Sequence, residues 1–111
     1  SKPKDKLWNV IITKSEANEM NKLINENDQL LFVIICAHKQ VKTNNTEIAV
    51  LYPKELKECI DLDCGINKNL RLSIRKVKHS PNLYIYGTHR ADKVAGRDNT
   101  IKIPRKRILE L

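Results

Sequence analysis

Two segments in which apolar residues alternate with polar ones constrain the fold of this chain more than any other feature. They lie in residues 69–90, NLRLSIRKVKHSPNLYIYGTHR, on either side of the turn-forming residues HSPN. A period of two places successive side chains on opposite faces of a β-strand, and proline suits a tight turn. The pattern therefore predicts an antiparallel hairpin with one buried face. That face is predicted to consist of Leu70, Leu72, Ile74, Leu83 and Ile85.

The opposite face of this hairpin carries arginine and tyrosine side chains. With a two-residue loop at Ser80 and Pro81, we expect Arg71 opposite Arg90, Ser73 opposite Thr88, Arg75 opposite Tyr86 and Val77 opposite Tyr84. Two like charges directly opposite each other destabilise a sheet, so the pair of arginines favours a bound anion. A shift of the register by one residue would exchange the two faces.

Side chains of these two types favour nucleic acid as the ligand. Tyrosine rings on an exposed sheet stack on unpaired bases, and arginine contacts phosphate through two nitrogens. Sheet faces of this kind bind single-stranded RNA, so we expect a nucleic-acid-binding domain, with single-stranded RNA or DNA favoured over duplex. The alternative is packing of tyrosine against arginine that only stabilises the hairpin. The predicted binding residues are Arg71, Arg75, Tyr84, Tyr86, His89, Arg90, Lys93, Arg97, Lys102, Arg105 and Arg107.

The distribution of charge also favours an anionic partner. The net charge is +8; residues 1–67 hold nine lysines and ten acidic residues, whereas residues 68–111 hold twelve lysines or arginines and three acidic residues. All six arginines lie in the second part. There, KIPRKR (102–107) fits a phosphate clamp or, in a eukaryote, part of a nuclear-import signal. Residues 87–99 are typical of a connecting loop, with an anion-binding nest as the alternative. A basic surface that only improves solubility is the other interpretation.

Periodicity in the rest of the chain predicts an α+β fold. Thr13 and Glu16 fit a helix capping box, Pro53 suits a first helical turn, and the apolar segment 29–41 is typical of a buried central strand. The predicted strands are 7–13, 29–41, 47–52, the two within 69–90, and 100–103, with helices after Thr13 and from Pro53.

The resulting order, β-α-β-β-α-β-β-β, predicts a mixed or antiparallel sheet of about five to six strands with two helices. Its first six elements match a ferredoxin-like core, to which a C-terminal hairpin would be added. Another α+β topology, with the helices on one face of the sheet, is the alternative.

Length and composition predict a single domain over residues 7–111, after a disordered basic segment, 1–6. The longest apolar run, LLFVIICA (30–37), is too short to span a bilayer, so no membrane contact is expected. The three cysteines argue against a complete disulfide framework and for an intracellular protein, cytoplasmic or nuclear. The spacing of cysteines and histidines matches no metal site or catalytic pair, so no metal, cofactor or enzymatic activity is expected.

The segments WNVIITKSEANEMNKLI (8–24) and LRLSIRKVKHSPNLYIYGTHRADKV (70–94) resemble the opening and closing segments of RelE/ParE-type bacterial toxins. The middle of the chain, 30–56, departs from the two successive helices of that family. The resemblance implies ribosome-dependent mRNA cleavage or gyrase inhibition, carried by Arg71, Arg75, His89 and Arg90. The alternatives to a nucleic-acid-binding domain are therefore a small basic endoribonuclease or toxin of this type and a domain that binds an acidic protein partner.

Overall fold

The computed structural model of the protein describes five parts of the chain and shows the predicted order of elements. The described residues are 6–27, 29–36, 46–63, 69–87 and 100–111. The elements are β1 (Lys6–Ile12), α1 (Lys14–Glu26), β2 (Phe32–Cys36), β3 (Glu47–Leu51), α2 (Pro53–Cys59), β4 (Leu70–Lys76), β5 (Asn82–Gly87), β6 (Ile101–Pro104) and the 3-10 helix η2 (Arg107–Glu110). The α+β class and the order β-α-β-β-α-β-β-β are therefore confirmed.

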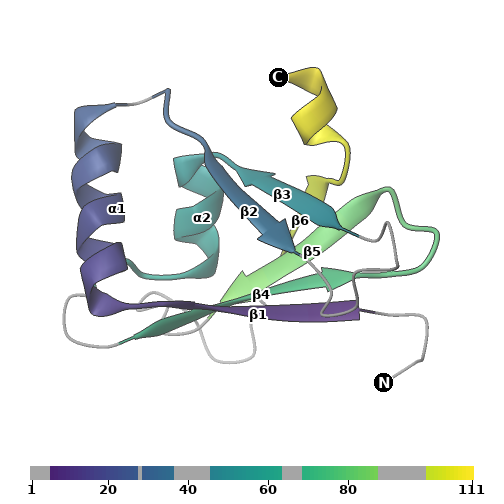
Figure 1. Cartoon of the computed structure of the whole chain (residues 1–111), viewed down its shortest axis with the longest axis horizontal. Coiled ribbons are helices and arrows are strands. Elements are labelled where there is room, and N and C mark those ends of the chain that lie inside the picture. Colours follow the sequence, from purple (N-terminus) through teal and green to yellow (C-terminus); the bar gives the residue numbers. More distant parts are fainter. Residues whose placement is uncertain (1–5, 28, 37–45, 64–68, 88–99) are drawn as a thin grey trace.

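The strands form two separate sheets. β1, β4, β5 and β6 make a four-stranded antiparallel sheet in the order β1-β4-β5-β6, and β2 pairs with β3 in a two-stranded antiparallel sheet. In Figure 1, β1 and β4 run along the bottom and β5 slants upward from them, while α1, α2 and the β2–β3 hairpin lie above β1 and β4. A ferredoxin-like core is not formed, because that arrangement would place β2 and β3 in one sheet with β1 and β4.

The face of the four-stranded sheet that points toward α2 and the β2–β3 hairpin, here called the inner face, supplies much of the core. Its five residues predicted from the β4–β5 alternation are each at most 1% exposed, which confirms the predicted buried face. From above, the core is completed by Ala17, Ala49, Leu51, Leu56, Cys59 and Ile60. The hydrophobic effect therefore holds the second layer against this one face.

Both helices begin at the predicted residues. The backbone N–H of Glu16 donates to Oγ1 of Thr13 at 3.2 Å, and the backbone N–H of Thr13 donates to Oε1 of Glu16 at 3.1 Å. The hydrogen bonds from the Thr13 backbone and side chain lower the pKa of the Glu16 carboxyl. α2 begins with Pro53 as its first residue. Near its end, a Cβ atom on Gly87 of β5 would lie 2.1 Å from Cγ2 of Ile60, so this close approach requires glycine.

β2 is not the buried central strand that its composition predicts. Val33 and Ile35 are 51% and 68% exposed, and β2 pairs with β3 alone. The apolar side chains at the alternate positions, Phe32, Ile34 and Cys36, pack against or within the core. An unbroken apolar run predicts burial on both faces, but among the described residues only one face of this strand packs against the core. The prediction of a buried central strand was therefore wrong for Phe32–Cys36, and residues 37–41 lie outside the described part of the chain.

The register of the β4–β5 hairpin differs from the prediction by two residues. The observed pairs include Arg75 with Tyr84 and Ser73 with Tyr86. Two-residue hairpin loops favour positive φ at their central positions, which Pro81 cannot adopt. The connection is longer, and the positive φ, 66°, lies at His79. Because the shift is an even number of residues, the described side chains of β4 and β5 keep their predicted faces.

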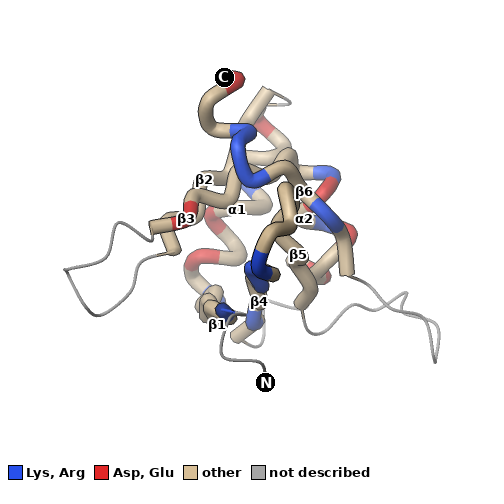
Figure 2. Tube along the Cα trace, turned by 90° about the vertical axis from the view of Figure 1, so that its right-hand side faces the viewer, with Lys and Arg blue, Asp and Glu red and all other residues tan. Residues whose placement is uncertain are grey.

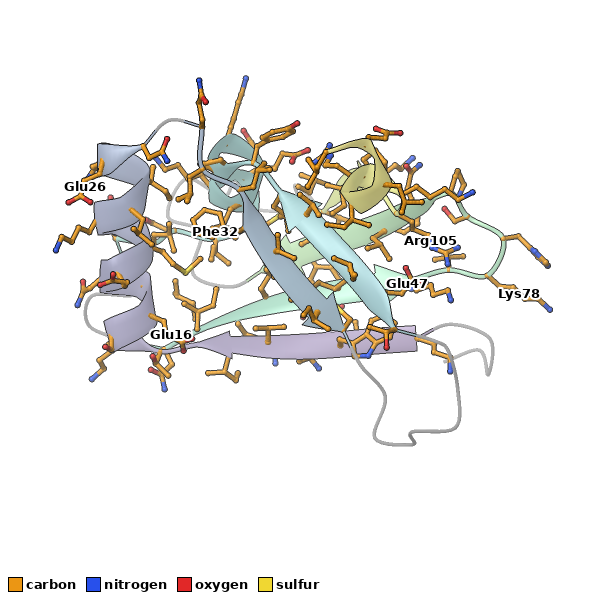
Figure 3. The ribbon with its side chains drawn as sticks, turned by 45° about the horizontal axis from the view of Figure 1, so that its top comes forward. Glu16, Glu26, Phe32, Glu47, Lys78 and Arg105 are labelled. Atoms are coloured by element: carbon orange, nitrogen blue, oxygen red, sulfur yellow. The ribbon has the colours of Figure 1, made fainter. Side chains whose placement is uncertain are left out.

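A nearly buried carboxylate connects the two sheets. Glu47, at the start of β3, is 8% exposed. Nη2 of Arg105 donates to its Oε1 at 2.5 Å, and Nζ of Lys76 lies 3.0 Å from the same oxygen. Figure 3 shows Glu47 and Arg105 close together beside the end of the β2–β3 hairpin. Burial raises the pKa of the Glu47 carboxyl, but hydrogen bonds and charge from Arg105 and Lys76 outweigh that effect, so the pKa lies below its ordinary value.

Candidate nucleic-acid interface

The outer face of the four-stranded sheet is the surface on which the predicted arginines and tyrosines meet. Alternation along the strands and the observed registers define this face. Its residues are Leu7, Asn9, Ile11, Arg71, Ser73, Arg75, Asn82, Tyr84, Tyr86, Lys102 and Pro104. Figure 1 shows α1, α2 and the β2–β3 hairpin on the opposite side of the sheet, so none of these elements covers the outer face.

One row across this face alternates cations with an aromatic ring. Arg75 of β4 lies opposite Tyr84 of β5, which in turn lies opposite Lys102 of β6. Nζ of Lys102 is 5.7 Å from the centroid of the Tyr84 ring, within the range of a cation–π contact. On the other side of Arg75 lies Leu7 of β1, which is 52% exposed. The row therefore combines an apolar side chain, two cations and a ring.

A second row contains polar side chains beside the other tyrosine. Asn9 of β1 lies opposite Ser73 of β4, and Ser73 lies opposite Tyr86 of β5. The Ser73 hydroxyl donates to Oδ1 of Asn9 at 2.7 Å. Next to this row, Ile11 is 54% exposed and lies opposite the exposed Arg71. Each tyrosine therefore has a different set of neighbours: cations flank Tyr84, whereas the Ser73 hydroxyl lies beside Tyr86 and the Asn9 amide lies one strand further along the row.

The four strands of the sheet contain no aspartate or glutamate, but they contain five lysines or arginines. Figure 2 shows basic positions near β1, β4 and β6, and acidic positions along α1. The acidic residues of the helices thus belong to the other layer of the molecule. On the outer face, the charges carried by Arg71, Arg75 and Lys102 all have the same sign, so the face favours an anionic ligand.

Two arginines predicted to bind nucleic acid have carboxylate partners within the chain. Arg105 pairs with Glu47, and the two terminal nitrogens of Arg107 donate to the two carboxylate oxygens of Glu55 on α2. The Arg107 guanidinium also lies 4.8 Å from the centroid of the Tyr52 ring. These contacts attach the C-terminal segment to the layer formed by α1, α2 and the β2–β3 hairpin, here called the upper layer. Binding of nucleic acid by these two arginines stays a prediction, and the outer face does not include them.

Four further predicted binding residues, His89, Arg90, Lys93 and Arg97, lie in a part of the chain that the structure does not describe. Thr88, the expected partner of Ser73, lies there as well. The expected opposition of Arg71 and Arg90 therefore lies outside the described residues as well. The site is accordingly built on the five predicted residues that the sheet brings together: Arg71, Arg75, Tyr84, Tyr86 and Lys102.

β1 adds three residues to the outer face that sequence reasoning missed: Leu7, Asn9 and Ile11. The alternation in LWNVII identified a strand, but no local signal shows that it pairs with a strand more than fifty residues later. Its partner decides which face its alternate side chains share. The pairing of β1 with β4 brings Leu7 next to Arg75 and Ile11 next to Arg71.

No family model matches this chain, and no curated protein or solved structure does. The resemblance to RelE/ParE-type toxins is thus carried by the two quoted segments alone. Within the described residues, no group of three or more His, Cys, Asp or Glu side chains is placed to hold a metal ion. Of the helices that the structure describes, none is long and apolar enough to cross a membrane.

Proposed function

We propose that the protein binds single-stranded nucleic acid on the outer face of its four-stranded sheet. The observation that carries this proposal is the row of Arg75, Tyr84 and Lys102, where a ring lies between two cations in a sheet without carboxylates. A base stacked on the ring would have a cation on either side for the adjoining phosphates. Arg71 and the exposed apolar side chains of β1 extend the same surface.

Single strands suit this surface better than a duplex. Bases in a duplex are stacked on each other and hidden from a sheet face, whereas unpaired bases can lie on aromatic side chains. Proteins that read duplex DNA commonly insert a basic helix into the major groove. Here α1 contains two lysines and three glutamates, so it offers no comparable basic surface.

Fluorescence anisotropy with labelled oligonucleotides, single-stranded and duplex, tests the proposal. Tyr84→Ala and Arg75→Ala should each weaken single-strand binding by about 1–3 kcal/mol. Lys102→Ala should weaken it as well, whereas the matched control Lys22→Ala, on α1, should leave it unchanged. If each of the three outer-face cations meets one phosphate, the logarithm of affinity should fall by about 2 for each tenfold rise in salt.

Three results would count against the proposal. The first is failure of any oligonucleotide to bind at low salt, and the second is equal binding by the wild type and Tyr84→Ala. The third is binding that does not depend on salt, since contacts with phosphate release counterions. Loss of RNA integrity during the incubation would favour the endoribonuclease instead. Binding of an acidic protein that ignores added nucleic acid would favour the protein-interaction domain.

A further inference from the structure

The hydrogen bond between Ser73 and Asn9 fixes an exposed amide on the outer face. Ser73 is only 2% exposed, and its hydroxyl donates to Oδ1 of Asn9 at 2.7 Å. Because this hydrogen bond holds the amide oxygen toward Ser73, the amide nitrogen of Asn9, with its two N–H groups, points away from the serine. Asn9 itself is exposed, so these donors are oriented before any ligand arrives.

We infer that Asn9 is a base-reading residue that gives the outer face a preference for uracil, which carries a carbonyl group at position 4, over cytosine, which carries an amino group there. The inference rests on the proposed function, because it requires a base on the neighbouring Tyr86. Asn9 would act through direct contact with that base. Ser73 is a positioning residue, since it acts only by holding the amide of Asn9.

The strand order places this amide within reach of a base on Tyr86. Asn9, Ser73 and Tyr86 are register partners on three successive strands. Neighbouring strands lie about 4.8 Å apart, so Asn9 and Tyr86 are about 10 Å apart along the row. The short side chain of Ser73 is nearly buried and does not stand between them. A base stacked on the near side of the Tyr86 ring would therefore extend over Ser73, and we infer that it presents the group at position 4 to Asn9.

The chemistry of the bases sets the preference. Uracil carries a carbonyl oxygen at position 4, which accepts a hydrogen bond, whereas cytosine carries an amino group there, which donates one. The N–H groups of Asn9 complement the carbonyl and oppose the amino group. Uracil and cytosine have similar ring size, so a comparison of the two separates this contact from stacking on tyrosine.

The experiment compares oligouridine with oligocytidine of equal length at neutral pH, using the full chain. The wild type should bind oligouridine about threefold to tenfold more tightly, as expected for one net hydrogen bond. In Asn9→Ala this ratio should fall to about one, while the affinity for oligocytidine changes little. Ser73→Ala should reduce the ratio, because the amide of Asn9 can then rotate. The control Asn18→Ala, an exposed asparagine on α1, should keep the full ratio.

The outcomes separate this inference from the proposed function. If no oligonucleotide binds, both are overturned. If oligonucleotides bind but the wild type does not distinguish the two bases, or if Asn9→Ala keeps the wild-type ratio, only the base-reading role is overturned. Retention of the full ratio by Ser73→Ala would remove the positioning role. Should Asn9→Ala unfold, Asn9→Ser supplies the same measurement, because it keeps a hydroxyl near Ser73 but has no amide.

Discussion

Replacement of Glu47 by glutamine tests how the β2–β3 hairpin is held on the four-stranded sheet. The wild-type carboxylate is nearly buried and pairs with both Arg105 and Lys76. Lys76 ends β4 and Arg105 directly follows β6, both strands of the large sheet, whereas Glu47 begins β3 of the small one. Glutamine has the same shape but no charge, so the variant removes the ion pairs and keeps the packing.

The expected loss of stability at neutral pH is about 1.5–3 kcal/mol, the range for hydrogen bonds to charged groups. The side chains of Arg105 and Lys76 are 29% and 21% exposed, so water compensates part of the lost contact and the lower half of that range is expected. Urea unfolding at pH 7 measures the difference. In a thermal melt, each kcal/mol corresponds to a fall of about 4–8 °C in Tm for a domain of about 100 residues.

The pH dependence of this difference gives a sharper test. The pKa of Glu47 is lowered in the folded protein from its ordinary value of 4.5. A carboxyl with a lowered folded pKa stabilises the fold above its unfolded pKa and loses that contribution as the pH falls through the folded pKa. The difference between wild type and Glu47→Gln should therefore be constant from pH 7 to about pH 5 and should shrink below pH 4.5.

Glu16 also has a lowered pKa, but it titrates in both proteins and cancels in the difference. A variant as stable as the wild type at pH 7 would show that the ion pairs do not hold the hairpin. A difference that persists unchanged well below pH 4 would refute the argument from charge, because protonated Glu47 should then behave like glutamine.

Three other measurements address the core, the C-terminal segment and a buried thiol. Ile85→Ala should lower the free energy of unfolding by about 2–5 kcal/mol, because the side chain is 0% exposed; an unchanged urea midpoint would contradict its place in the core. Arg107→Ala should lower Tm, since Arg107 pairs with Glu55 of α2; an unchanged Tm would contradict a stabilising role for this pair. Burial, followed by the charge of a nearby glutamate, raises the pKa of the Cys36 thiol to about 11. Replacement of Cys64, which lies outside the described residues, by serine leaves the two buried thiols of Cys36 and Cys59. In this variant Cys36 should react slowly with a thiol reagent at pH 8 until denaturant is added. Rapid labelling of Cys36 in the folded protein would contradict its burial.

The local part of this fold is already determined by the sequence. The capping residues Thr13 and Glu16 lie three positions apart and find each other within one helical turn, so no distant contact is needed to predict them. The alternation in β4 and β5 likewise separates core from surface, because a strand with a period of two has only two faces. For this reason Arg71, Arg75, Tyr84 and Tyr86 share the outer face, although the register differs by two residues.

Long-range pairing is what only the tertiary structure decided. The apolar run of β2 has no signal that says how many of its faces will be covered, and Ile35 is exposed because no described element packs on that side. Arg105 and Arg107 have the composition of a phosphate clamp, yet Glu47 and Glu55, each more than fifty residues away, provide carboxylate partners for them. Asn9 and Ser73 meet for the same reason, since β1 and β4 are neighbours only in space. Contacts between distant segments depend on how whole layers pack. The local sequence of one segment therefore does not identify the residues that packing places beside it.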